Sequence, residues 1–164
     1  MTVDGFGRPQ ESKRTADGAV SVFAADVDRD GDVDVVAASA GNHTVAWYNN
    51  DGSQSFAERV ITTLADGARE VTAIDVDGDL AVDVLSASAY DDTVAWYEND
   101  GSQSFTERVI TTLADAQSVF AIDVDGDGDV DALSASGGDD TVAWYENDCD
   151  AHAASAAPTP RPTV

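Results

Sequence analysis

Short apolar runs alternate with polar turns along most of the chain. The turns are rich in Gly, Asn, Asp and Ser, as in the Asn-Asp-Gly-Ser segment at residues 50–53. Short runs bounded by such turns predict β-strands, and no segment has the spacing of an amphipathic helix. In the first part of the chain, the expected strands are residues 20–25, 33–39, 44–48 and 56–62.

This strand pattern occurs three times. The segment Thr-Val-Ala-Trp-Tyr stands at residues 44–48, 93–97 and 141–145, so the repeat is 48 to 49 residues long. Four short strands in a repeat of this length are typical of a β-propeller blade. We expect the Trp-Tyr pair to pack between neighbouring blades, whose first two strands are rich in small residues. The sequence therefore predicts an all-β fold with three blades, at about residues 16–64, 65–113 and 114–148.

The two ends of the chain depart from this repeat. The first two units have a clear fourth strand, ending near Thr63 and Thr112, but the third unit has none. Residues 1–15 precede the first unit at the place of a fourth strand, so we expect them to supply an outer closing strand to a blade. Pro9 suits such an edge strand, where a missing N–H is tolerated. Residues 149–164 are rich in Pro and Ala and are expected to form a disordered tail.

An aspartate-rich segment follows the first apolar run of every unit. It occupies residues 26–34, 75–83 and 123–131, which we call the first, second and third aspartate loops. Carboxylates at positions 1, 3, 5 and 9 can converge on one ion if the backbone curls around it, and the position-7 carbonyl can add an oxygen. The candidate ligand residues are Asp26, Asp28, Asp30, Asp32 and Asp34; Asp75, Asp77, Asp79, Ala81 and Asp83; and Asp123, Asp125, Asp127, Asp129 and Asp131.

These residue types favour calcium. A ligand set made only of oxygen atoms suits a hard cation, and calcium accepts a crowded, irregular shell better than magnesium does. An EF-hand is excluded, because position 12 is Ala37, Ser86 or Ser134 in place of Glu and the flanking segments predict strands. Up to three calcium ions per chain are expected. The second loop is the exception in sequence, since Leu80 replaces the glycine at position 6 and is expected to strain or alter the bend.

The repeat resembles the FG-GAP/VCBS repeat of β-propellers, which occurs in integrin α-chain heads, fungal lectins and bacterial surface proteins. The resemblance covers residues 16–148, and the pattern D-x-D-x-D-G-x-x-D at residues 26–34 and 123–131 carries it. It implies calcium between the first and second strands of a blade, and an extracellular or cell-surface location. The phenylalanine-glycine element is only approximate, since Phe56 and Phe105 are not followed by glycine.

Composition narrows the possible partners. The net charge of −24 argues against nucleic acids and anionic membranes, both of which need a cationic surface. No apolar run is long enough to insert into a membrane, and residues 1–5 do not begin a signal peptide. Cys149 is the only cysteine, so no disulfide within the chain is expected.

Three blades are fewer than the four to eight that usually close a propeller. A lone arc would expose two blade faces, so we expect closure by oligomerisation, with a homodimer of six blades favoured. The alternative is that the chain is a piece of a longer propeller.

Two classes of function fit this pattern. The first is a calcium-binding module with a structural or protein-interaction role. The alternative is a lectin with sites between blades, where Trp47, Trp96 and Trp144 could stack on a sugar. An enzyme is not expected, because His43 occurs in only one unit, His152 lies in the tail, and no nucleophile-base arrangement repeats.

Overall fold

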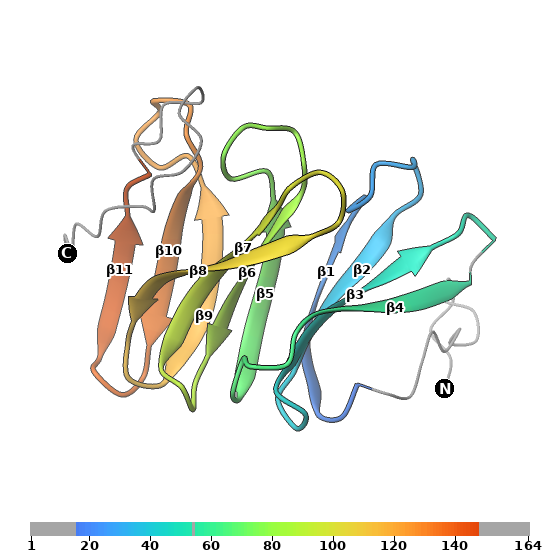
Figure 1. Ribbon diagram of the computed structural model, residues 1–164. Coiled ribbons are helices and arrows are strands. Elements are labelled where there is room, and N and C mark those ends of the chain that lie inside the picture. The colour runs from blue at the N-terminus through green and yellow to red at the C-terminus, as the bar shows by residue number, and fades with distance from the viewer. Residues whose placement is uncertain (1–15, 54, 148–164) are drawn as a thin grey trace, which may run out of the picture.

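The computed structural model describes residues 16–53 and 55–147, which form three antiparallel β-sheets placed side by side (Figure 1). The first sheet contains β1 (Ala19–Ala25), β2 (Asp34–Ser39), β3 (Thr44–Asn50) and β4 (Phe56–Thr62). The second contains β5 (Ala68–Ile74), β6 (Asp83–Ser88), β7 (Thr93–Asn99) and β8 (Phe105–Thr112). The third contains β9 (Ala116–Ile122), β10 (Asp131–Ser136) and β11 (Thr141–Tyr145).

In every sheet, the order of the strands in space follows their order in the sequence. The prediction of an all-β fold made of propeller blades is therefore confirmed. Within the described residues the third sheet has no fourth strand, as the sequence indicates. The closing strand expected from residues 1–15 and the tail expected from residues 149–164 both lie outside the described residues. No helix among the described residues is long and apolar enough to cross a membrane.

The core lies between the sheets. One buried cluster joins the first and second sheets and contains Trp47, Val45 and Val71. An equivalent cluster joins the second and third sheets and contains Trp96, Val94 and Val119. Since each tryptophan is buried against the following sheet, the expected packing between blades is confirmed for Trp47 and Trp96.

The first strands of the three sheets, β1, β5 and β9, lie next to one another, and we call them the inner strands. Side chains join them across each junction. The Ser21 hydroxyl accepts a hydrogen bond from the Val71 N–H at 3.3 Å, and the Glu70 carboxylate accepts one from the Val119 N–H at 3.2 Å. At each junction, a side chain of one inner strand thus accepts a main-chain N–H of the next, so the inner strands are linked although they belong to separate sheets.

Candidate metal centres

The three aspartate loops connect the first two strands of each sheet and lie at the same end of the molecule (Figure 1). Each connection is short, so the chain reverses its direction within the aspartate-rich segment. The loops thus stand where the sequence places them, between an inner strand and its neighbour.

Each loop brings three carboxylates together. In every group, one oxygen atom of each of the three side chains lies within 4.8 Å of the others. Oxygen atoms at this separation can share a single cation, and without one the negative charges repel. The groups are Asp26, Asp28 and Asp34; Asp75, Asp77 and Asp83; and Asp123, Asp125 and Asp127.

Positions 1 and 3 belong to all three groups, but the third member varies. Position 9 completes the first two groups, whereas position 5 completes the third. The candidates outside the groups are Asp30, Asp32, Asp79, Ala81, Asp129 and Asp131. Ala81 is buried, and its N–H donates to the Asp79 carboxylate at 2.7 Å, so its main chain helps to shape the turn.

The position-9 aspartates (Asp34, Asp83 and Asp131) are buried and anchor their loops through both oxygens. Asp83 accepts the N–H of Val76 at 3.0 Å and the N–H of Asn99 at 2.7 Å. The same two bonds occur in the first loop, from Val27 and Asn50, and in the third, from Val124 and Asn147. Each anchor therefore ties its loop to the end of the third strand of its own sheet.

Burial raises the pKa values of three loop carboxyl groups, two of them position-9 anchors. Burial raises the pKa of Asp83 to about 7, although its two main-chain hydrogen bonds act in the opposite direction. Burial also raises the pKa values of Asp34 and Asp77 above the usual range of aspartate. A bound cation would offset this cost by stabilising the charged form of the carboxylate.

The bend of the second loop is the same as that of the others. Leu80 has a φ of 76°, and its N–H donates to Asp75 at 2.9 Å, as Gly31 donates to Asp26 and Gly128 to Asp123. Of the two expected outcomes, a strained bend or an altered one, the structure shows strain, because Leu80 itself adopts the left-handed conformation. The expected strain remains, since a residue with a Cβ at such a φ costs energy.

Sequence reasoning missed a second left-handed position in each loop. At position 4, Arg29 has a φ of 61°, while Gly78 and Gly126 have 77° and 83°. The first loop therefore carries its own strained residue. The frequent glycines at positions 4 and 6 were the available signal.

Two further polar residues next to the loops were also missed. The Asn49 amide donates to Asp28 at 2.6 Å. At the same repeat position in the second sheet, Glu98 adds negative charge near Asp77 and forms an ion pair with Arg108. The Glu-Asn and Asn-Asn pairs after each Trp-Tyr were the sequence signal, but only the register of the third strand shows that they face the loop.

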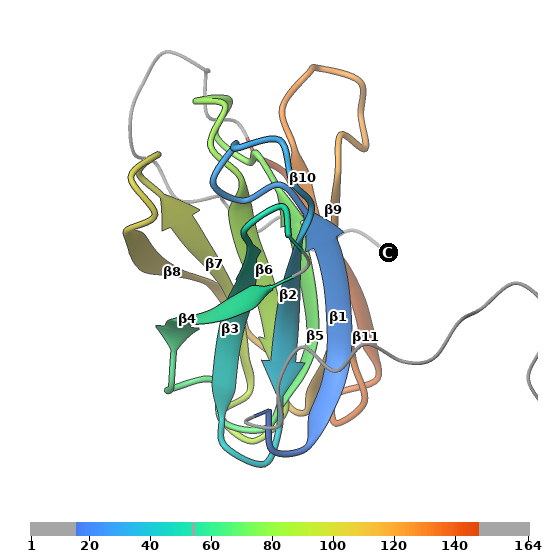
Figure 2. The same ribbon diagram turned by 90° about the vertical axis from the view of Figure 1, so that its right-hand side faces the viewer.

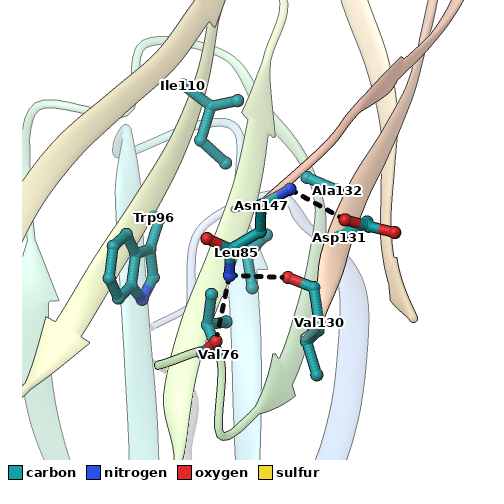
Figure 3. A pocket seen from close by; sticks show the side chains of 8 residues that line it. All are labelled: Val76, Leu85, Trp96, Ile110, Val130, Asp131, Ala132 and Asn147. Atoms are coloured by element: carbon teal, nitrogen blue, oxygen red, sulfur yellow. Dashed lines mark hydrogen bonds between the residues drawn. The ribbon is translucent and has the colours of Figure 1, made fainter. Parts of the chain in front are cut away.

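A cavity beside the third anchor is too small for a ligand (Figure 3). It has a volume of about 10 Å³ and lies between the second and third sheets. Asn147 borders it and donates to the carbonyl of Val76 at 3.2 Å and to that of Val130 at 3.1 Å. This amide therefore links the second aspartate loop to the third sheet.

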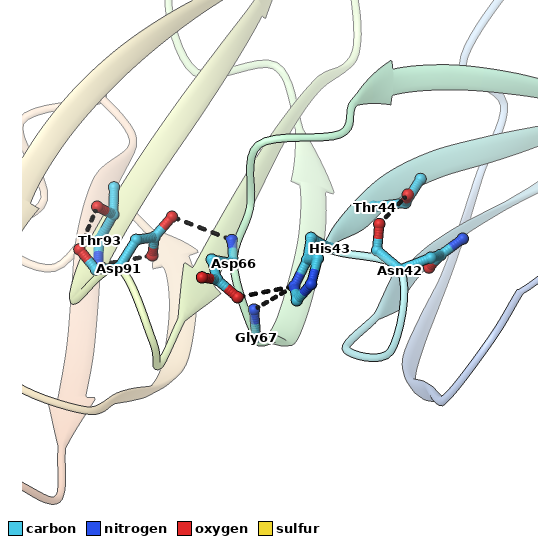
Figure 4. A network of polar contacts seen from close by, with 7 residues as sticks. All are labelled: Asn42, His43, Thr44, Asp66, Gly67, Asp91 and Thr93. Atoms are coloured by element: carbon cyan, nitrogen blue, oxygen red, sulfur yellow. Dashed lines mark hydrogen bonds and ion pairs between the residues drawn. The ribbon is translucent and has the colours of Figure 1, made fainter.

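The opposite end of the molecule holds the one histidine that the structure describes (Figure 4). His43 Nδ1 lies 2.7 Å from an Asp66 oxygen and 3.3 Å from the Gly67 nitrogen, so the turn after β2 contacts the linker before β5. At the next junction, Asp92 takes this place and accepts the N–H of Asp115 at 2.8 Å. His43 thus occupies a position that joins neighbouring sheets.

Comparison with known families gives a direct match. The model of the FG-GAP-like repeat matches residues 26–86 and again residues 75–134, so that each match begins at an aspartate loop. A search of curated proteins found no match to the chain.

Proposed function

The chain belongs to the FG-GAP-like repeat family, and from this premise we propose that it is a calcium-binding β-propeller module with a structural or protein-interaction role. The observation that carries the proposal is the convergence of three carboxylates in each of the three aspartate loops. The donor atoms near each group are oxygens, which fit calcium. When bound, calcium would neutralise the clustered charges and hold each loop in its folded conformation.

Calcium explains features that a plain turn would not need. Fourteen of the 32 acidic residues stand in the three loops, which a simple reversal of the chain does not require. Asp83 is buried at a cost in free energy, as its raised pKa indicates, and burial also raises the pKa of Asp34. A cation in each loop would offset both the repulsion and the burial. This role suits a calcium-rich setting outside the cell or at its surface.

Equilibrium dialysis with calcium tests the proposal directly. We expect up to three bound calcium ions per chain, with magnesium in the same concentration range failing to displace them. Retention of no calcium would overturn the proposal, and equal displacement by magnesium would overturn the choice of metal.

A carbohydrate-binding role is the second candidate, and one cleft favours it. Trp47, Arg59 and Gln103 help to line a cleft of about 230 Å³ between the outer parts of the first and second sheets. Its polar groups could hydrogen-bond to a sugar, but Trp47 is only 2% exposed and has little surface for stacking. A glycan array probed with the calcium-loaded protein distinguishes the candidates, because reproducible binding to one glycan class favours the lectin.

A further inference from the structure

The two outermost sheet faces expose residues that are buried at equivalent positions inside the molecule. Each junction between sheets uses one type of face on the earlier sheet and another type on the later sheet. Among the residues that the structure describes, no further sheet covers the outer side of the third sheet, which has a face of the first type. None covers the outer side of the first sheet, which has a face of the second type.

The third sheet shows the first type of face. Val142 on β11 is 65% exposed, whereas Val45 and Val94 at the same repeat position are fully buried. Phe120 and Ile122 on β9 are also exposed. We call the outer side formed by Phe120, Ile122, Val124 and Val142 the third-sheet face.

The first sheet shows the complementary type. Val22 on β1 is 69% exposed, whereas Val71 and Val119 at the same repeat position are buried against the preceding sheet. Figure 2 shows this sheet nearest the viewer, with β1 along its side. Val20 on the same strand is exposed as well. We call the outer side formed by Val20, Val22 and Ala24 the first-sheet face.

Polar groups on the inner strands match in the same way. Ser21 and Glu70 each accept the N–H of a valine on the next sheet, Val71 and Val119 respectively. Ser118 stands at the same repeat position of the third sheet. A following first sheet would therefore bring the Val22 N–H to the Ser118 hydroxyl, and the junction would gain the hydrogen bond that both internal junctions contain.

The third aspartate loop shows the effect of the missing neighbour. Val27 and Val76, at position 2 of the first two loops, are buried in the clusters that join the sheets. Val124 at this position of the third loop is 43% exposed. At position 3, Asp125 is exposed, whereas Asp28 and Asp77 are half-buried. The third loop thus lacks the cover that the next sheet gives to the others.

We propose that a second copy of this chain packs its first-sheet face against the third-sheet face, and that this contact completes the third calcium site. Two copies joined head to tail at both ends close a ring of six sheets, within the usual range for propellers. Because the contact covers the third loop, calcium binding there and assembly favour each other. The coupling to calcium rests on the proposed function, whereas the contact itself does not.

Substitutions on the two faces test the contact. Val22→Arg and Val142→Arg both change exposed side chains, so the single chain should fold while the contact between copies is lost. Light scattering in calcium should give twice the 17.0 kDa of one chain for the unchanged protein and 17.0 kDa for each variant. Val109→Arg is the matched control, because Val109 is 52% exposed and its counterpart Val60 is exposed although a sheet follows it. This control should keep the mass of the pair.

Calcium titration of the same proteins tests the coupling. In Val142→Arg we expect two ions to bind as before and the third to bind roughly 5- to 150-fold more weakly, as is usual for coupled sites. The contact is overturned if the unchanged protein has the mass of one chain or of three or more. It is also overturned if both face variants remain pairs. Three unchanged affinities in Val142→Arg would overturn the coupling alone. A protein that pairs but binds no calcium would overturn the proposed function and leave the contact standing.

Discussion

The first two aspartate loops and the third share the main-chain hydrogen bonds that anchor and bend them, but their surroundings differ. In all three, the position-9 carboxylate accepts two main-chain N–H groups, and the position-6 N–H returns to position 1. Within residues 16–53 and 55–147, a following sheet covers only the first two loops and buries Val27 and Val76. The local sequence therefore suffices to form the loop, whereas its burial depends on a neighbour that stands about 49 residues further along the chain.

The largest effect should come from removing calcium from all three loops. A ligand present at about one hundred times its dissociation constant stabilises the folded state by roughly 2.7 kcal/mol per site. We expect the melting temperature to fall sharply in excess chelator, measured by circular dichroism. The first two loops should account for most of the loss in dilute protein, because the third lacks its cover. An unchanged melting temperature would rule out calcium binding and, with it, the proposed difference between the covered loops and the third.

Loss of a position-9 anchor should come next, and it should be similar in covered and uncovered loops. Asp83→Ala leaves the buried N–H groups of Val76 and Asn99 without partners, at about 1–3 kcal/mol each. Asp131→Ala should cost a similar or slightly smaller amount, because its carboxylate also accepts two main-chain N–H groups, although that of Val124 is only partly buried.

Urea unfolding in chelator measures this cost without the metal. Asp79→Ala in the same loop is the control, since this carboxylate is exposed and accepts one bond within the turn from Ala81. It should lose about 1 kcal/mol or less. A much smaller loss for Asp131→Ala than for Asp83→Ala would show that the two kinds of loop also differ internally.

Single ligand losses should separate the covered loops from the third. Asp28→Ala and Asp125→Ala should each remove one calcium ion, which equilibrium dialysis can count. In dilute protein Asp28→Ala should lower the melting temperature more, because its half-buried site holds its ion more tightly. At high protein concentration the two losses should converge, as a second copy covers the third loop. Equal losses at every concentration would contradict the influence of the neighbouring sheet.

Much of the fold could be predicted because its signals are local and repeated. The alternation of apolar runs and turns gave the strands, and the spacing of Trp47, Trp96 and Trp144 gave the three units. The burial of the first two tryptophans followed from their size and their apolar neighbours. These inferences need only a strand period of two residues and a repeat that packs on itself.

The details of the site were harder to predict because they depend on register and backbone conformation. Asn49 and Glu98 reach the loops from a strand about 20 residues further along, and only the pairing of β2 with β3 and of β6 with β7 brings them there. Arginine usually avoids a positive φ, so only the glycines at the same position of the other two loops indicate the conformation of Arg29. The second loop was expected to differ because glycine was taken as a requirement at position 6. Leu80 instead keeps the bend at a modest cost in conformational energy.

The smallest predicted effect concerns this strain at position 6. Leu80 is 71% exposed, so Leu80→Gly removes little packing and relieves a left-handed conformation that costs about 1–2 kcal/mol. The greater freedom of glycine in the unfolded chain opposes this by about 0.4–1 kcal/mol, so the net gain should be roughly 0.5 kcal/mol.

The reverse change, Gly128→Leu, should cost a similar amount in the third loop, because no atom lies within 4 Å of the Cβ it would add. Urea unfolding of both variants in chelator measures the two changes in the free energy of unfolding. Opposite shifts of similar size would show that position 6 of the second and third loops accepts either residue in the same bend. A loss of stability in Leu80→Gly would show that the leucine side chain makes a contribution that outweighs its strain.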